Sequence, residues 1–146
     1  MSAADASGSA SADASGSASA DAGGSAPLSE GEANASTLPV PLALLFCSAP
    51  PDQADALARA LVEEGLCACV SVLPSAVSHY RWKGELERSE ESLLLLKTRR
   101  DRVPALRERL AALHPYELPE LLGLAPDPAL SSEAYQAWVA QESRGA

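Results

Sequence analysis

Side chains able to do chemistry concentrate in residues 114–120, whose sequence is HPYELPE. An imidazole, a phenol and two carboxylates lie there, and all of these groups can reach a metal ion or a partner chain. Pro115 and Pro119 each fix φ and remove a backbone donor, so neither a helix nor a central strand can run through the segment. We therefore expect a rigid, mostly extended connector. A stiff loop that merely joins a helix to a strand is the simpler interpretation.

The chain of 146 residues changes character near residue 38. Residues 1–38 are mainly Ala, Ser, Gly and Asp, and an octapeptide that starts at Ala4 recurs unchanged at Ala12. Because this stretch has almost no large apolar side chains, it cannot offset the entropy lost on ordering. We expect a disordered, acidic, low-complexity tail. Residues 39–146 then form one domain of common size.

The net charge of −9 argues against polyanionic partners. Five acidic and no basic residues lie in the tail, which leaves 15 acidic and 11 basic residues for the domain. Neither part offers the basic surface that nucleic acid or an anionic membrane attracts. A secretory signal is not expected without basic residues near Met1, and the apolar run at 40–47 is too short to span a bilayer. Three cysteines, an odd number, fit reduced thiols, so we expect a cytoplasmic protein.

The apolar pattern predicts the elements that must position residues 114–120. Their order is β-α-β-β-α-β with a final helix, which is the split βαβ or ferredoxin-like arrangement of one antiparallel sheet and two helices on one face. We expect a strand buried on both faces at 40–48, a helix capped by Asp52 and ended by Gly65, a strand at 66–82 interrupted at residues 74–75, a return strand from 85 to 96, a helix at 101–113, a strand at 119–125 and a helix capped by Ser131 or Ser132.

The two middle strands form a hairpin that is long for so small a domain, with Lys83-Gly84 as its turn. Such a hairpin at a sheet edge leaves backbone groups without partners. Tyr80 and Trp82 add large apolar area near its tip, which one subunit would struggle to bury. His79 is expected on the opposite side of the hairpin. We therefore expect the chain to self-associate through the hairpin.

These blocks, in this order, resemble the CutA family of divalent-cation tolerance proteins. The resemblance implies an α+β, ferredoxin-like domain assembled as a tight trimer, with long hairpins that pair between subunits. It also implies a likeness to the trimeric nitrogen-regulatory P-II proteins. The tail is not part of the family pattern. The resemblance covers about residues 42–140 and rests on AP at 49–50, ALVEE at 60–64, ACV at 68–70, YRWKG at 80–84, Glu91, KT at 97–98, HPYE at 114–117, PE at 119–120 and YQAW at 135–138.

The resemblance implies copper or another divalent cation as a ligand. Copper favours thiolate and imidazole, so Cys47, at the end of the first strand, and His114 are the expected metal ligands. Leu113 stands where a copper-binding bacterial relative has a further histidine. Cys67 and Cys69 are expected to share one strand face, where they could hold a soft metal or simply fill the core.

Tyr80, Trp82, Tyr116 and Glu117 are the candidates for a trimer interface or an inter-subunit cleft, where aromatic rings could stack on a small molecule or pack between subunits. Two functions remain open. The first is a homotrimeric tolerance protein that binds copper or another divalent cation, with no obligatory cofactor. The second is a P-II-like sensor or scaffold that binds a small molecule or a protein. We expect no enzymatic activity, because no Ser/His/Asp order, phosphate loop or acid pair is evident.

Overall fold

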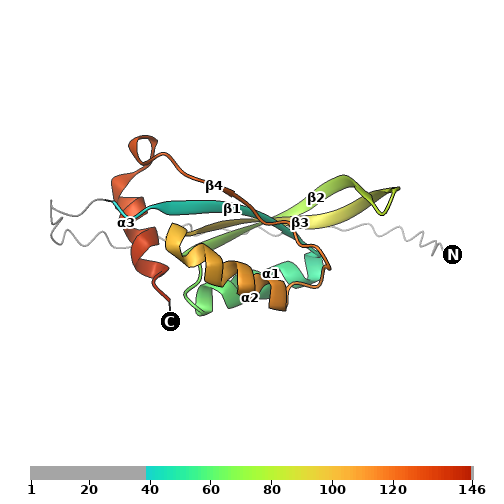
Figure 1. Ribbon diagram of the computed structural model, residues 1–146, viewed down its shortest axis with the longest axis horizontal. Coiled ribbons are helices and arrows are strands. Elements are labelled where there is room, and N and C mark those ends of the chain that lie inside the picture. The colour runs from blue at the N-terminus through green and yellow to red at the C-terminus, as the bar shows by residue number, and fades with distance from the viewer. Residues whose placement is uncertain (1–38, 146) are drawn as a thin grey trace, which may run out of the picture. The chain divides into compact units, whose positions relative to one another are not determined.

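The computed structural model describes residues 39–145, so the tail expected at residues 1–38 lies outside the described part (Figure 1). Four strands form one antiparallel sheet in the order β2-β3-β1-β4. This sheet and the order of its elements confirm the α+β, ferredoxin-like fold. The elements are β1 (Leu42–Ala49), α1 (Pro51–Glu63), β2 (Cys69–Trp82), β3 (Glu85–Arg99), the 3-10 helix η1 (Arg100–Arg102), α2 (Val103–Leu113), β4 (Leu122–Leu124), the 3-10 helix η2 (Pro128–Leu130) and α3 (Glu133–Glu142).

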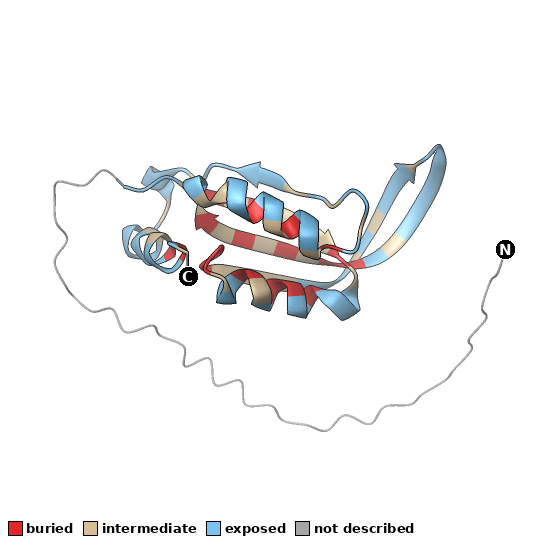
Figure 2. Ribbon diagram, turned by 60° about the horizontal axis from the view of Figure 1, so that its bottom comes forward, coloured by how far each residue is buried: buried red, intermediate tan, exposed pale blue. Residues whose placement is uncertain are grey.

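Helices α1 and α2 lie together against one face of the sheet (Figures 1 and 2). Every second residue of β1 from Ala43 to Ala49 is buried and joins the core that these helices complete. The intervening residues, among them Leu44 and Phe46, stay half-exposed. The prediction that this strand is buried on both faces is therefore wrong for the single chain. Both helices pack on one side, and the second apolar face of the strand is left for other contacts.

The ends of α1 follow from local backbone chemistry. Pro50 occupies the N-cap position and Asp52 lies inside the first turn, so the prediction that Asp52 caps the helix is wrong. Proline suits this start because it has no backbone donor to leave without a partner. Gly65 ends the helix as predicted, with φ +67°, and the N–H of Leu66 bonds to the carbonyl of Leu61 at 3.0 Å. This is the Schellman arrangement that glycine favours.

Leu66 and Cys67 remain hydrogen-bonded to the end of α1, and β2 begins only at Cys69. The N–H of Cys67 bonds to the same Leu61 carbonyl at 3.2 Å, and its side chain is fully buried in the core. Cys69 is half-buried, and its Sγ lies 3.6 Å from Lys97 Nζ. The prediction that the two thiols share one strand face is therefore wrong.

Strands β2 and β3 form the expected long hairpin, whose distal half is largely exposed and extends beyond the helices (Figure 2). Trp82 pairs with Glu85 across the turn, where Lys83 and Gly84 have φ of +49° and +86°. Positive φ at both positions belongs to the type I′ turn, which matches the twist of paired strands. The predicted interruption at residues 74–75 is a β-bulge.

The connector at residues 114–120 begins where α2 ends, at Leu113. His114 already has an extended backbone, with ψ of 136°, because a following proline disfavours helical geometry in the residue before it. The fourth strand is shorter than predicted, since only 122–124 pair with β1 rather than 119–125. Pro119 cannot donate to a ladder, which disfavours the predicted start of the strand at that residue.

Helix α3 closes the described part of the chain. The Oγ of Ser132 accepts a hydrogen bond from the N–H of Tyr135 at 3.3 Å, so Ser132 is the cap of the two candidates. Val139 is the buried side chain of this helix. Within residues 39–145, no helix is both long and apolar enough to cross a membrane.

Candidate functional site

Cys47 and His114, the two expected metal ligands, meet at the C-terminal end of β1. His114 Nε2 lies 2.8 Å from the Ser48 carbonyl oxygen, and the Cys47 thiol points to the same oxygen at 3.7 Å. The second ring nitrogen, Nδ1, accepts the N–H of Tyr116 at 3.1 Å. Because a carbonyl can only accept, Nε2 carries the ring proton. Both nitrogens of His114 thus have protein partners.

The surroundings favour a protonated Cys47. Burial raises the pKa of this thiol to about 12, with further contributions from the carboxylates of Glu120 and Glu91. Burial and a hydrogen bond to Glu91 likewise raise the pKa of Tyr116. Metal ions bind the thiolate, so a metal at Cys47 must first displace a tightly held proton.

The geometry does not supply a preformed metal centre. Among residues 39–145, no group of three or more His, Cys, Asp and Glu side chains is placed to hold a metal ion. A metal at Cys47 and His114 would need one imidazole hydrogen bond to break and the thiol to ionise. Metal binding at these two residues stays a prediction.

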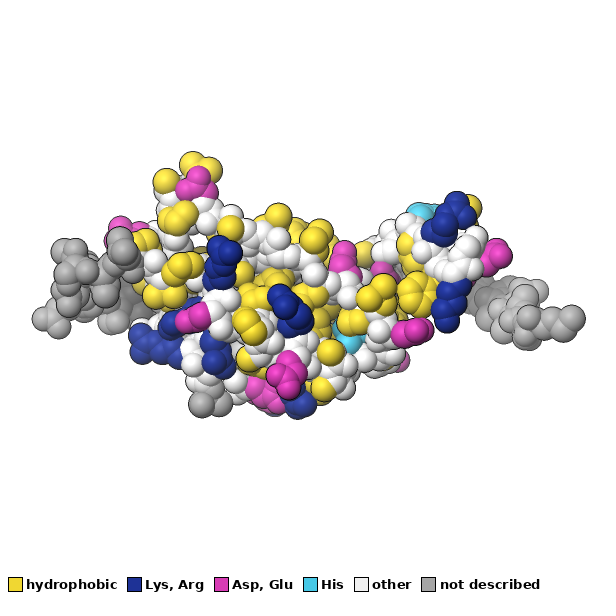
Figure 3. Space-filling view, viewed as in Figure 1, with side chains coloured by type: hydrophobic (Ala, Val, Ile, Leu, Met, Phe, Trp, Pro, Cys, Tyr) yellow, Lys and Arg dark blue, Asp and Glu magenta, His cyan; other side chains and the backbone are white. Residues whose placement is uncertain are grey.

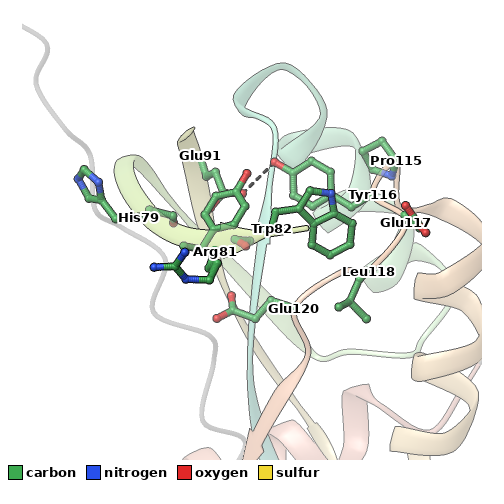
Figure 4. A pocket seen from close by; sticks show the side chains of 12 residues that line it. His79, Arg81, Trp82, Glu91, Pro115, Tyr116, Glu117, Leu118 and Glu120 are labelled. Atoms are coloured by element: carbon green, nitrogen blue, oxygen red, sulfur yellow. Dashed lines mark hydrogen bonds between the residues drawn. The ribbon is translucent and has the colours of Figure 1, made fainter. Parts of the chain in front are cut away.

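A cavity of about 700 Å³ opens beside the connector, between it and the hairpin (Figure 4). It includes all four residues predicted for an interface or cleft, namely Tyr80, Trp82, Tyr116 and Glu117. Its walls therefore join segments more than 30 positions apart in the sequence. Whether these residues form a trimer interface stays a prediction. The complete lining comprises Ser48, Ser78, His79, Tyr80, Arg81, Trp82, Glu91, Pro115, Tyr116, Glu117, Leu118 and Glu120.

A hydrogen bond between Tyr116 and Glu91 joins the connector to the hairpin at this pocket. The Tyr116 hydroxyl donates to Glu91 Oε1 at 2.8 Å, and the Glu91 side chain is buried (Figure 4). The ring of Tyr116 also packs against His114, with 4.8 Å between the ring centroids. His114 thus orients Tyr116, which forms one wall of the pocket, through this packing and through the hydrogen bond that it accepts from the Tyr116 N–H. His79 extends away from the other labelled side chains (Figure 4).

Comparison with known families decides the relationship. The family model described as CutA1 divalent ion tolerance protein matches residues 43–142. This chain belongs to the CutA1 family. The prediction of family from the spaced sequence blocks is confirmed, and the HPYELPE connector lies inside the matched region.

CutA relatives agree in sequence and in structure. A divalent-cation tolerance protein CutA of Thermus thermophilus is 52% identical over a region that covers 47% of this chain and 66% of the relative. Human protein CutA is 36% identical over a region that covers 79% of this chain and 64% of the human protein. The chain thus spans a little under two thirds of these relatives. A solved structure of the T. thermophilus divalent cation tolerance protein has a TM-score of 0.66 at 40% identity, covering 70% of this chain and 98% of that one. A PII-like CutA from Nostoc has a TM-score of 0.68 at 35% identity, covering 71% and 99%.

Two acidic members of the CutA pocket, Glu91 and Glu120, were not predicted to line it, although the Glu120 carboxylate was counted among the connector groups able to reach a metal ion or a partner chain. Both belong to blocks that carried the resemblance. Glu91 opens the stretch of β3 in which buried residues begin, next to Ser92 and ahead of Leu94. An acidic residue at the edge of an apolar run was the available signal, because a buried carboxylate needs a partner.

Proposed function

We propose that this CutA-family chain serves divalent-cation tolerance as a homotrimeric, P-II-like sensor that binds a small molecule or a protein segment in the pocket beside the hairpin. The observation that carries the proposal is the cavity itself, whose volume of about 700 Å³ suits a small-molecule site. Its lining combines the aromatic side chains of Tyr80, Trp82 and Tyr116 with polar groups, as such sites commonly do. The Nostoc relative described as a PII-like protein supports the same role.

The proposed trimer would cover the apolar surface that one chain leaves exposed. On the face shown in Figure 3, apolar side chains remain visible over the centre and on the hairpin. Leu73, Val77 and Leu86 of the hairpin are 42%, 46% and 77% exposed, and Leu122 and Leu124 of β4 are also exposed. Apolar area of this extent along sheet edges commonly marks an interface. A cytoplasmic location, which suits the free thiols of the described chain, is part of the proposal.

A binding role is preferred to a catalytic one because the His114 imidazole is fully hydrogen-bonded and the Cys47 thiol is protonated. His114 has both nitrogens hydrogen-bonded, and its proton is donated to a backbone carbonyl. The raised pKa of Cys47 keeps this thiol from acting as a nucleophile near neutral pH. Neither residue is therefore arranged as a general base or an attacking group.

The pocket is tested by replacing each of the chain's two tryptophans with alanine in turn. Native mass spectrometry of the gently purified oligomer should reveal a trimer that carries a small molecule or peptide. Trp82→Ala removes a pocket wall and should lose that ligand, whereas Trp138→Ala alters α3, away from the lining residues, and should keep it. A stable monomer at micromolar concentration would contradict the trimer. Equal occupancy in both variants would contradict the pocket.

Direct binding of copper or another divalent cation at Cys47 and His114 is the second candidate, and the convergence of both side chains on the Ser48 carbonyl supports it. On the preferred proposal, titration with Cu(I) and Cu(II) at pH 7 should give the same weak affinity for the unmodified protein and for Cys47→Ala. Cys69→Ala is the matched control, since Cys69 is half-buried and lies elsewhere on the sheet. A site of one ion per subunit that disappears only in Cys47→Ala would favour the metal-binding candidate instead.

A further inference from the structure

The pocket has an excess of acidic side chains. Three of its lining residues, Glu91, Glu117 and Glu120, are acidic, whereas Arg81 and His79 are its basic residue types. Arg81 donates from Nη1 to the Gly84 carbonyl at 3.2 Å, a contact within the hairpin turn. A phosphate or carboxylate ligand would therefore approach like charges across a short distance, which is unfavourable in a partly enclosed site.

Among these acids Glu91 is the one whose side chain is buried, because it is only 5% exposed. Its Oε1 accepts from the Tyr116 hydroxyl, a neutral donor. None of the ion pairs formed within residues 39–145 includes Glu91 or Glu120. A buried carboxylate without a cationic partner is costly, and a cation that enters the pocket would reduce this cost.

An ammonium group already lies between an aromatic ring and a carboxylate at the edge of this region. Lys83 Nζ is 5.5 Å from the ring centroid of Trp82 and 3.7 Å from Glu117 Oε2. Both charged side chains are well exposed, so this pair is weak. The ammonium group of a ligand nearer to the buried Glu91 would also contact an aromatic ring and a carboxylate. Both contacts would be stronger there because the site is less exposed to water.

We propose that this pocket selects small organic ammonium ions, held by Glu91 and Glu120 and by the faces of the surrounding aromatic rings. The inference rests on the proposed function and specifies the chemical class of its ligand. The ring quadrupole attracts alkylated ammonium groups, and the carboxylates supply the neutralising charge. The pocket excludes anionic metabolites by the same charges.

The test compares choline with 3,3-dimethylbutan-1-ol, its neutral isostere, and uses tetramethylammonium as a second cation. Trp82 fluorescence reports binding once the other tryptophan is removed by Trp138→Phe. Choline should bind at least about tenfold more tightly than its isostere. Glu91→Gln should weaken choline binding by about tenfold, which corresponds to about 1.4 kcal/mol. Glu90→Gln is the matched control, because Glu90 is the neighbour on β3 and does not line the pocket.

Three results of the binding titrations would overturn the inference. One is equal binding of choline and its isostere, and another is equal choline affinity in Glu91→Gln and Glu90→Gln. The third is failure of both cations to bind at tens of millimolar, as expected if a basic side chain of a second copy fills the pocket. A neutral or anionic ligand that depends on Trp82 in native mass spectrometry would refute the ammonium class and keep the proposed function. Absence of any Trp82-dependent ligand would refute both.

Discussion

Replacement of His114 by alanine should lower the free energy of unfolding by about 2–4 kcal/mol. This side chain is 7% exposed, and both of its ring nitrogens are hydrogen-bonded. Alanine would leave a cavity beside Tyr116 and would remove the partners of the Ser48 carbonyl and the Tyr116 N–H. Buried polar groups that lose their partners carry the full cost of desolvation. Chemical denaturation followed by circular dichroism measures the loss.

His79→Ala is the matched control, since it removes the chain's other histidine from an exposed position on β2. Surface changes of this kind typically alter stability by less than about 0.5 kcal/mol. A loss in His114→Ala no greater than that in His79→Ala would show that the imidazole is not a structural link between the connector and β1. The pocket wall formed by Tyr116 would then need another explanation for its orientation.

Cys69 should be the fast-reacting thiol of the native protein at pH 8, because it is half-buried whereas Cys47 and Cys67 are fully buried. Burial is the main reason that the pKa values of Cys47 and Cys67 rise from 9.0 to about 12. At pH 8 a thiol of pKa 9.0 is about one-tenth thiolate and one of pKa 12 about one ten-thousandth, so Cys47 and Cys67 should react about a thousandfold more slowly in the native than in the unfolded protein. Reaction with Ellman's reagent under native and denaturing conditions measures the difference, and mass spectrometry of the labelled peptides identifies the site.

The same two thiols should make the fold sensitive to alkali. An unfolded thiol ionises near pH 9.0, whereas the folded groups ionise near pH 12, so the unfolded state loses its protons first. Stability from these groups is complete below pH 9 and falls by about 1.4 kcal/mol per pH unit for each thiol as the pH rises toward 12. A Cys47→Ala, Cys67→Ala double variant should show a shallower fall in unfolding free energy. An unchanged slope, or native labelling of Cys47 as rapid as that of Cys69, would contradict the prediction.

The order of elements could be predicted because each boundary has a local cause. Gly65 ends α1 through its positive φ, and Lys83-Gly84 turns the hairpin for a similar reason. Pro115 ends α2 by restricting the residue before it. Such causes act over a few residues, so they are readable without knowledge of tertiary contacts. One error arose at Cys67, whose N–H remains bonded to Leu61 at the end of α1, so that β2 begins later than the alternating pattern predicts.

The sequence by itself determined the fold class, the family and the importance of HPYELPE, because these depend on periodicity, turn chemistry and spacing along the chain. Tertiary structure alone decided which groups the connector contacts. Folding places the Ser48 carbonyl against the ring of His114 and Glu91 against the hydroxyl of Tyr116, across separations of 66 and 25 residues. Those contacts give His114, an expected metal ligand, two hydrogen-bond partners within the protein, and an acidic, aromatic pocket lies beside it. The physical reason is that burial and partner choice depend on neighbours in space, which a one-dimensional pattern does not contain.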